Sequence, residues 1–229
     1  MTVEQETQYG FGEPDEWAFA QGYELVAGVD EVGRGAMAGP LVAAAVIISP
    51  DTVPTMAADS KTLSVEQRNE ACEEIRQSSI AWAIGVVEPD MIDRLNVWGA
   101  TCLAMRRALE GLRVRPDFTL IDGLEPRGIQ VPYRCFIGGD ACSPRIGAAS
   151  ILAKVMRDRM MERLALIYRG YGLECNRGYM TLEHRKAVRR LGPSPIHRRR
   201  FRLVAEMRGN HLPFDPKEMA GLTESGAGQ

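Results

Sequence analysis

Short apolar runs recur along this chain and alternate with polar segments, a pattern typical of proteins that alternate strands with helices. The first two runs, at residues 25–29 and 41–48, have no polar face, so they predict central strands covered on both sides. A short glycine-containing segment joins them and favours an antiparallel pair. Further apolar runs predict strands at residues 80–87, 118–121 and 131–137.

The first polar segments carry clear helix signals. Ser64, followed three residues later by Gln67, forms a capping box and predicts a helix over residues 65–77. Pro89 begins a second helix, which extends to about residue 112.

The later part of the chain adds two helices. Small residues at 146–155 predict a helix that packs closely against the sheet. A short helix over residues 184–191 ends at Gly192. These elements predict an α/β fold with a mixed central sheet flanked by helices and a C-terminal helical extension.

The ends of the chain differ in composition from its centre. Residues 1–19 are acidic and polar, so we expect a flexible lead, with the first ordered element near Tyr23. Residues 20–212 form one predicted domain, whose basic helical part spans about 170–212. Residues 213–229 are polar and rich in glycine and predict a flexible tail.

Composition narrows the class of protein. The 229 residues are 45% hydrophobic and 25% charged, which is ordinary for a soluble globular chain. The five cysteines are dispersed and never spaced C-x-x-C, which argues against a disulfide framework and a zinc site. We find no targeting segment and no apolar run long enough to span a membrane. We therefore expect a cytoplasmic protein without a membrane partner, and a monomer.

A net charge of −2 conceals a strong asymmetry. Residues 1–33 contain eight acids and no Lys or Arg, whereas residues 145–208 contain sixteen Lys or Arg against five acids. Such a basic half indicates a polyanionic partner, although scattered arginines also occur on ordinary solvated helices. The run from His197 to Arg200 predicts a cationic patch for a DNA backbone, with salt-dependent binding.

Acidic residues follow several of the predicted strands. Asp30 and Glu31 end the first strand, Asp122 ends the fourth, and Asp140 follows the fifth. A single acid at such a position usually caps a turn, but acids at corresponding ends converge on one crevice of an α/β sheet. Mg²⁺ and Mn²⁺ prefer such oxygen ligands, and a pair of these ions assists phosphodiester hydrolysis.

Neighbouring residues suggest how a substrate is bound. Adjacent strand residues point to opposite faces, so we place Asp30 on the metal side and expect Glu31 to reach in from the rim. The exposed N–H groups of Gly33 and Gly35 and the planar donor of Arg34 suit a phosphate or sugar, although a simple turn is the alternative.

Two further pairs are candidate phosphate contacts. Ser60 and Lys61 supply a hydroxyl and an ammonium ahead of the first helix, but a solvated loop is the commoner meaning of such a tripeptide. Ser150 and Lys154 are four residues apart and share a helix face, where core packing is the alternative. Asp158 is expected to form an ion pair and is not assigned to the metal set.

These motifs together resemble ribonuclease HII, the bacterial type 2 ribonuclease H. The resemblance spans about residues 26–201, in the family's order. The matching segments are VDEVGRG at 29–35, DSK at 59–61, IDG at 121–123, GD at 139–140, AASILAKVMRD at 148–158 and GYMT at 178–181, continuing to His184.

The resemblance implies a ribonuclease H-like fold and an endonuclease that cleaves the RNA strand of RNA–DNA hybrids. It also implies nicking 5′ to single ribonucleotides in duplex DNA, leaving 5′-phosphate and 3′-hydroxyl ends, as in ribonucleotide removal during replication and repair. Asp30, Glu31, Asp122 and Asp140 match the family's catalytic acids, which implies Mn²⁺ or Mg²⁺ as cofactor. The segment Gly33–Gly35 matches its reader of the ribose 2′-OH.

Tyr179 matches the family's residue that stacks on the deoxyribose at the RNA–DNA junction. Two positions depart from the family pattern. Gly138 stands where Lys is frequent, and Gly147 stands where Ala is usual. Neither departure removes an acid.

Other classes of function stay open at this level. A non-catalytic hybrid-binding protein would use the same basic face, and another nuclease of the same fold, such as a junction resolvase, would cut branched DNA. A replication clamp is a further candidate partner, but we recognise no clamp-binding peptide in the tail.

Overall fold

The computed structural model describes residues 9–49 and 63–209. Its centre is a five-stranded sheet in the order β3-β2-β1-β4-β5. The strands are β1 (Val26–Val32), β2 (Leu41–Ile47), β3 (Ala81–Val87), β4 (Phe118–Asp122) and β5 (Tyr133–Phe136). β2 pairs antiparallel with β1 and β3, while β4 pairs parallel with β1 and β5. The predicted mixed sheet is confirmed, although β5 is shorter than the sequence indicated.

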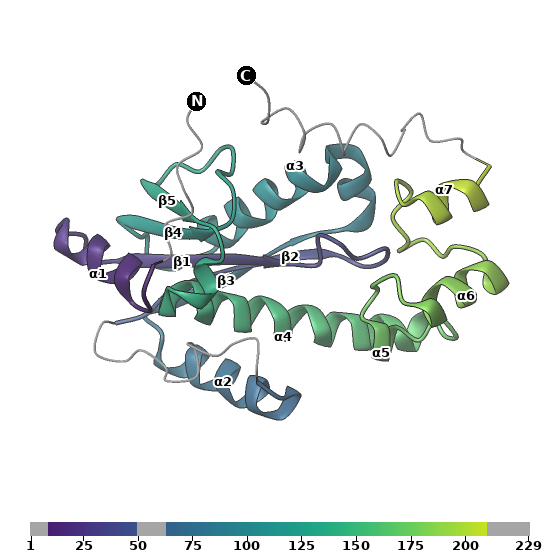
Figure 1. Ribbon diagram of the computed structural model, residues 1–229, viewed down its shortest axis with the longest axis horizontal. Helices are drawn as coiled ribbons and strands as arrows, with labels where there is room; N and C mark the ends of the chain where they lie inside the picture. Colours follow the sequence, from purple (N-terminus) through teal and green to yellow (C-terminus); the bar gives the residue numbers. More distant parts are fainter. Residues whose placement is uncertain (1–8, 50–62, 210–229) are drawn as a thin grey trace, which may run out of the picture.

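Helices cover both faces of the sheet (Figure 1). Helix α3 (Pro89–Glu110) lies on one face, and α2 (Val65–Ser78) and α4 (Pro144–Ile167) lie on the other. Alternate residues of β2 enter two separate cores: Ala43 and Ala45 pack toward α3, whereas Ala44 packs toward α2 and α4. The apolar run at 41–48 therefore lacks a polar face because both sides of β2 are buried.

Local sequence signals explain where these helices begin. The side chain of Ser64 accepts a hydrogen bond from the backbone N–H of Gln67, and the Gln67 side chain binds the Ser64 backbone N–H. This confirms the predicted capping box. Helix α3 begins at Pro89 as predicted, but it breaks at Asn96, where φ is 62°. The side chain of Asn96 then accepts from Gly99 N–H at 3.0 Å and restarts the helix.

The first ordered element lies earlier than the sequence indicated. Helix α1 (Glu13–Ala20) occupies part of the segment expected to be a flexible lead. Its Asp15 is buried and forms a 2.7 Å ion pair with the buried Arg145 of α4. The expectation was wrong for this stretch because the partner of Asp15 lies 130 residues away, where no local pattern reveals it.

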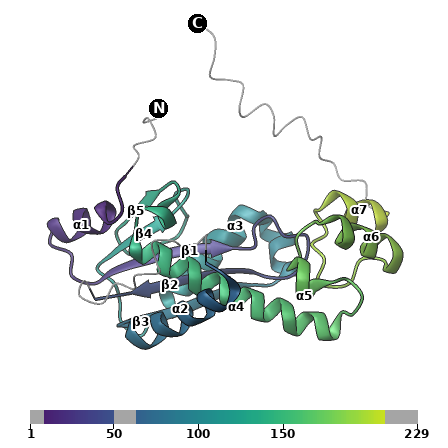
Figure 2. The ribbon, with the colours of Figure 1, turned by 60° about the horizontal axis from the view of Figure 1, so that its bottom comes forward.

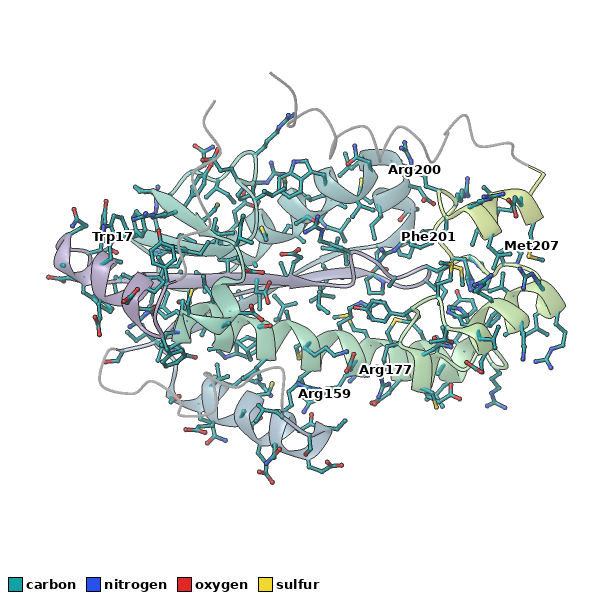
Figure 3. All side chains as sticks on the ribbon, in the orientation of Figure 1. Trp17, Arg159, Arg177, Arg200, Phe201 and Met207 are labelled. Carbon is teal, nitrogen blue, oxygen red and sulfur yellow. The ribbon has the colours of Figure 1, made fainter. Side chains whose placement is uncertain are left out.

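The remaining helices form one end of the molecule. Helices α5 (Leu173–Asn176), α6 (Leu182–Leu191) and α7 (Arg202–Met207) cluster beyond the C-terminal half of α4 (Figure 2). Trp17 of α1 and Met207 of α7 lie toward opposite ends of the molecule (Figure 3). Among the described residues, no helix combines the length and the apolarity that crossing a membrane requires.

Candidate active site

The acidic residues gather at the carboxyl ends of three adjacent parallel strands. In the parallel register of β1 and β4, Val29 pairs with Ile121, and the next residues are Asp30 and Asp122. β5 lies beside β4, and the short 3₁₀ helix η3 (Gly139–Ala141) that follows it carries Asp140. The sheet topology therefore brings together segments that are about 90 residues apart in the sequence.

Asp30 is buried, with 6% of its surface exposed. Burial raises the pKa of its carboxyl well above the usual value, and the charges of Asp122 and Glu31 raise it further. Hydrogen bonds from the Ser150 side chain and from the Glu31 backbone N–H, at 2.7 Å, act in the opposite direction. A carboxylate that is both desolvated and repelled by its neighbours is favourable only beside a cation.

Glu31 is held by a side chain from its own loop. Burial raises the pKa of the Glu31 carboxyl, and Arg34 counteracts this through an ion pair of 3.1 Å. The Arg34 guanidinium also lies 5.9 Å from the centre of the Trp98 ring. Arg34 is thus oriented between an acid of β1 and an aromatic residue of α3.

Asp122 connects the sheet edge to η3. Its Oδ1 accepts a 2.6 Å hydrogen bond from the backbone N–H of Gly139, the residue before Asp140. Burial raises the pKa of the Cys142 thiol, and the charges of Asp15, Asp122 and Asp140 raise it further. Asp122 and Asp140 therefore lie within electrostatic range of the same side chain.

The donor set fits a hard divalent cation. Asp30, Glu31, Asp122 and Asp140 provide only oxygen ligands, which Mg²⁺ and Mn²⁺ prefer over nitrogen or sulfur. Within residues 9–49 and 63–209, no three His, Cys, Asp or Glu side chains already stand in an arrangement that would hold a metal ion.

Two buried arginines hold residues 33–40, the loop between β1 and β2, which we call the glycine loop. Arg157 of α4 donates to the carbonyls of Pro40, at 3.0 Å, and Ala38, at 3.3 Å. Arg198 donates to the carbonyls of Arg34, at 2.9 Å, and Gly39, at 3.0 and 3.2 Å. Burial lowers the pKa of Arg198 to about 9, so it stays charged at neutral pH. The glycine loop is therefore fixed by charge-assisted hydrogen bonds to its backbone.

The glycines of this loop have different surroundings. Gly33 has φ of +93°, and a Cβ there would overlap Nε of Arg157. Gly35 is exposed, and a Cβ there would meet nothing within 4 Å. The first glycine is required by the fold, whereas the second leaves open space above the loop.

Tyr179 lies beside the same loop. The preceding Gly178 accepts hydrogen bonds from Met37 N–H, at 2.8 Å, and Ala38 N–H, at 3.1 Å. The half-buried ring of Tyr179 lies 5.2 Å from the Arg157 guanidinium. Tyr179 and Gly33 therefore both adjoin Arg157, although 144 residues separate Tyr179 from Gly35 in the sequence.

The other predicted contacts divide into three cases. Ser150 faces the acids through its hydrogen bond to Asp30. Lys154 forms a 2.8 Å ion pair with Asp158, which confirms that Asp158 is ion-paired. Ser60 and Lys61 lie outside the described residues.

The predicted cationic patch at 197–200 is wrong for its first half. His197 and Arg198 are buried, and only Arg199 and Arg200 are exposed. Arg200 lies toward the end of the molecule formed by α5, α6 and α7 (Figure 3). A count of charges does not distinguish an arginine that faces solvent from one that binds backbone carbonyls.

Sequence reasoning missed several residues that shape this site. Trp98, Arg157 and Arg198 contact the glycine loop or its arginine. Trp98 and Arg198 were visible only as members of a helix and of a basic run, and both patterns have more common meanings. Arg157 belongs to the matching segment at 148–158, but nothing in that segment indicated its role.

Comparisons with known proteins agree with this geometry. The Ribonuclease HII family profile matches residues 27–204. The ribonuclease HII of Moorella thermoacetica is 50% identical over 182 residues, covering 80% of this chain and 88% of its own.

Solved structures of other ribonucleases are also similar to this chain. Ribonuclease H2 from Pyrococcus horikoshii superposes with a TM-score of 0.69 at 26% identity, covering 80% of this chain and 97% of its own. Ribonuclease HII from Archaeoglobus fulgidus, solved in a complex with PCNA, gives a TM-score of 0.67 at 28% identity, covering 77% and 95%.

The mixed sheet, its flanking helices and these neighbours define a ribonuclease H-like fold. The chain belongs to the ribonuclease HII family. It is therefore an enzyme, an endonuclease that hydrolyses the RNA strand of RNA–DNA hybrids. A purely hybrid-binding function is thereby set aside.

Proposed function

We propose that this enzyme nicks duplex DNA on the 5′ side of single embedded ribonucleotides, leaving 5′-phosphate and 3′-hydroxyl ends. Such cleavage would begin the removal of ribonucleotides during DNA replication and repair. The observation that carries the proposal is that Gly178, next to Tyr179, accepts hydrogen bonds from Met37 and Ala38, which follow the Gly33–Gly35 motif. The Tyr179 ring and Gly33 also both lie against Arg157. A site that reads one ribonucleotide next to deoxyribonucleotides needs both readers within a few ångströms of the scissile bond.

We assign Asp30, Glu31, Asp122 and Asp140 to binding Mg²⁺ or Mn²⁺. When bound, such ions supply Lewis-acid stabilisation of the phosphodiester oxygens and activation of water. Asp30 lies within β1 and Asp122 is the last residue of β4, so the sheet fixes the backbone of both. Glu31 is oriented by Arg34, and Asp140 by the bond from Gly139 to Asp122.

The remaining residues would orient the substrate. The exposed backbone of Gly35 and the side chain of Arg34 face solvent, where a ribose and its phosphate have room. We assign Gly33, Arg34 and Gly35 to the 2′-hydroxyl and its phosphate, and Tyr179 to the following deoxyribose. Ser150 supports Asp30, and Lys154, Ser60 and Lys61 remain candidate phosphate contacts.

The decisive experiment uses a labelled DNA duplex containing one ribonucleotide, with Mg²⁺, Mn²⁺ or EDTA, beside an all-DNA duplex and a branched DNA duplex. We expect a metal-dependent nick at the 5′ side of the ribonucleotide and no cut in either DNA control. Asp30→Asn should abolish the nick while the duplex still binds. Cleavage of a long hybrid without this nick would refute the proposal, and cleavage of branched DNA would favour a resolvase.

We also propose that one chain is sufficient for the reaction, because every assigned residue belongs to it. A sliding clamp is a candidate partner, since the Archaeoglobus relative was solved with PCNA. Residues 210–229 lie outside the described part of the chain. Size-exclusion chromatography of the enzyme alone and with a bacterial clamp tests both points, and a dimer alone or a separate elution with the clamp would contradict them.

A further inference from the structure

Two buried histidines lie close to Tyr179, one of the residues that we propose to bind the substrate. His184 is on α6, and His197 is in the segment between α6 and α7. Their Nε2 atoms are 3.1 Å apart, and His184 Nδ1 lies 2.9 Å from the carbonyl oxygen of Tyr179. The hydrogen-bond partners of the two rings are each other, Tyr179 and Ser194, and the proposed chemistry does not use either histidine.

The hydrogen bonds assign one tautomer to each ring. Ser194 donates its backbone N–H to Nδ1 of His197 at 3.1 Å, so this nitrogen is an acceptor. The proton of His197 is therefore on Nε2 and is donated to His184 Nε2. His184 in turn carries its proton on Nδ1 and donates it to the Tyr179 carbonyl. The result is a directed chain from Ser194 to the backbone of Tyr179.

The residue after His197 reaches the other reader. Arg198 donates to the carbonyl of Arg34, in the middle of the Gly33–Gly35 motif, and its own backbone N–H binds Met37 at 2.9 Å. His197 also forms an isolated β-bridge with Ala38. His197 thus connects through His184 to Tyr179, and the next residue, Arg198, connects to the glycine loop.

We infer that His184, His197 and Arg198 are positioning residues that hold Tyr179 and the glycine loop in one fixed relation. The inference rests on the proposed function, because it concerns recognition of a ribonucleotide followed by a deoxyribonucleotide. The histidines hold the reader of the deoxyribose, and Arg198 holds the reader of the ribose. Discrimination between the junction and a uniform hybrid depends on this relation.

An alternative is that these groups only stabilise the α5–α7 end. That role would not need a hydrogen bond to the Tyr179 carbonyl, since apolar residues fill a core at least as well. The distinction is measurable, because loss of stability lowers activity on every substrate alike. Loss of positioning lowers it selectively for the junction substrate.

Matched substitutions at His184 separate the two roles. Asparagine places an amide N–H near the position of Nδ1 and keeps a donor for the Tyr179 carbonyl, whereas glutamine extends toward the Nε2 position and does not. The readout is the ratio of kcat/KM on a duplex with one ribonucleotide to kcat/KM on a uniform RNA–DNA hybrid. We expect His184→Gln to lower this ratio by about three- to tenfold, and His184→Asn to leave it within about twofold.

A double variant tests whether His184 acts through Tyr179. In a Tyr179→Ala background, His184→Gln should cause no further change in the ratio, because the positioned ring is already absent. Equal losses on both substrates, equal effects of asparagine and glutamine, or a full effect in the Tyr179→Ala background would each overturn the inference.

Arg198→Lys provides an independent test from the glycine loop. Lysine keeps the charge but lacks the planar fork that binds Arg34 and Gly39 together. We expect a decrease in the same ratio of about three- to tenfold. This variant decides the matter if His184→Gln does not fold, and an unchanged ratio would count against the inference.

The inference and the proposed function fail in different ways. If the wild-type enzyme does not nick at a single ribonucleotide, the proposed function fails before any variant is made, and the inferred role fails with it. Nitrogen-15 NMR of the histidine rings tests the hydrogen-bond chain without activity. We expect the proton on Nδ1 of His184 and on Nε2 of His197, and the opposite tautomers would overturn the positioning role while the proposed function stands.

Discussion

The carboxylate of Asp122 accepts a 2.6 Å hydrogen bond from the backbone N–H of Gly139. This bond connects the end of β4 to η3, which carries Asp140. A Cβ on Gly139 would approach the side chain of Ile146 at 2.6 Å and Phe136 Cβ at 3.1 Å. A side chain at Gly139 would therefore require Ile146 to move and the backbone that positions Asp140 to shift by a few tenths of an ångström away from Phe136.

We expect Gly139→Ala to lower kcat/KM by roughly tenfold or more, because a small displacement of a catalytic acid is costly. The matched control is Gly138→Asn, at a position with φ of +68° and open space, which asparagine tolerates. The control should stay within about twofold of wild type. Steady-state cleavage of a hybrid substrate measures both, and equal activities would show that η3 tolerates the displacement.

Alanine substitutions at Gly33 and Gly35 should have different effects, the first on stability and the second on substrate binding. Gly33→Ala forces a side chain against Arg157 at positive φ, so we expect a loss of about 1–3 kcal/mol in unfolding free energy. Gly35→Ala meets no atom of the protein, so stability should change by less than about 0.5 kcal/mol.

The effect of Gly35→Ala should instead appear on substrate, as a raised KM on hybrid and junction substrates. Urea unfolding measures the stability of both variants, and initial rates of cleavage measure their KM. A destabilised Gly35→Ala, or one that binds substrate normally, would contradict the assignment of open space to the substrate.

The ion pair between Asp15 and Arg145 should stabilise the whole domain. Asp15→Ala leaves the buried guanidinium without its carboxylate, and removing one partner of a buried pair costs about 3–5 kcal/mol. Glu16→Ala, on the same helix but exposed, is the control and should be nearly neutral. Urea denaturation compares them, and similar midpoints would mean that α1 is not coupled to the core.

The histidine pair predicts a pH dependence of stability. Burial, with smaller effects of His184 and Arg208, lowers the pKa of His197 to about 4, while the unfolded chain keeps a value near 6.5. Between these values the unfolded state binds more protons, so stability falls as pH decreases from about 6.5 to 4. The loss attributable to His197 is about 3 kcal/mol at most.

This dependence is measured by urea unfolding at pH 7 and at pH 4.5. Carboxyl groups also titrate in this range, so the comparison is with His197→Gln, which lacks the titrating ring. We expect a smaller change between the two pH values in the variant. Equal changes would show that His197 is not held in its neutral form.

The sequence by itself determined most of the secondary structure and the identity of the acids. Apolar runs without a polar face predicted the central strands β1 and β2, and the Ser64–Gln67 capping box predicted the start of α2. Asp30, Asp122 and Asp140 were visible because each comes at or after the end of an apolar run, although β1 itself continues beyond Asp30 to Val32. These signals are local, since hydrophobic periodicity and capping depend on neighbours within a few residues.

Only the tertiary structure decided what the basic residues do and how the readers meet. Arg145, Arg157 and Arg198 looked like surface charge, but each binds a partner more than 100 residues away and is buried. The same holds for α1, whose polar sequence suggested a flexible lead. The free energy that orders these residues comes from long-range hydrogen bonds and ion pairs, and a linear pattern carries no information about them.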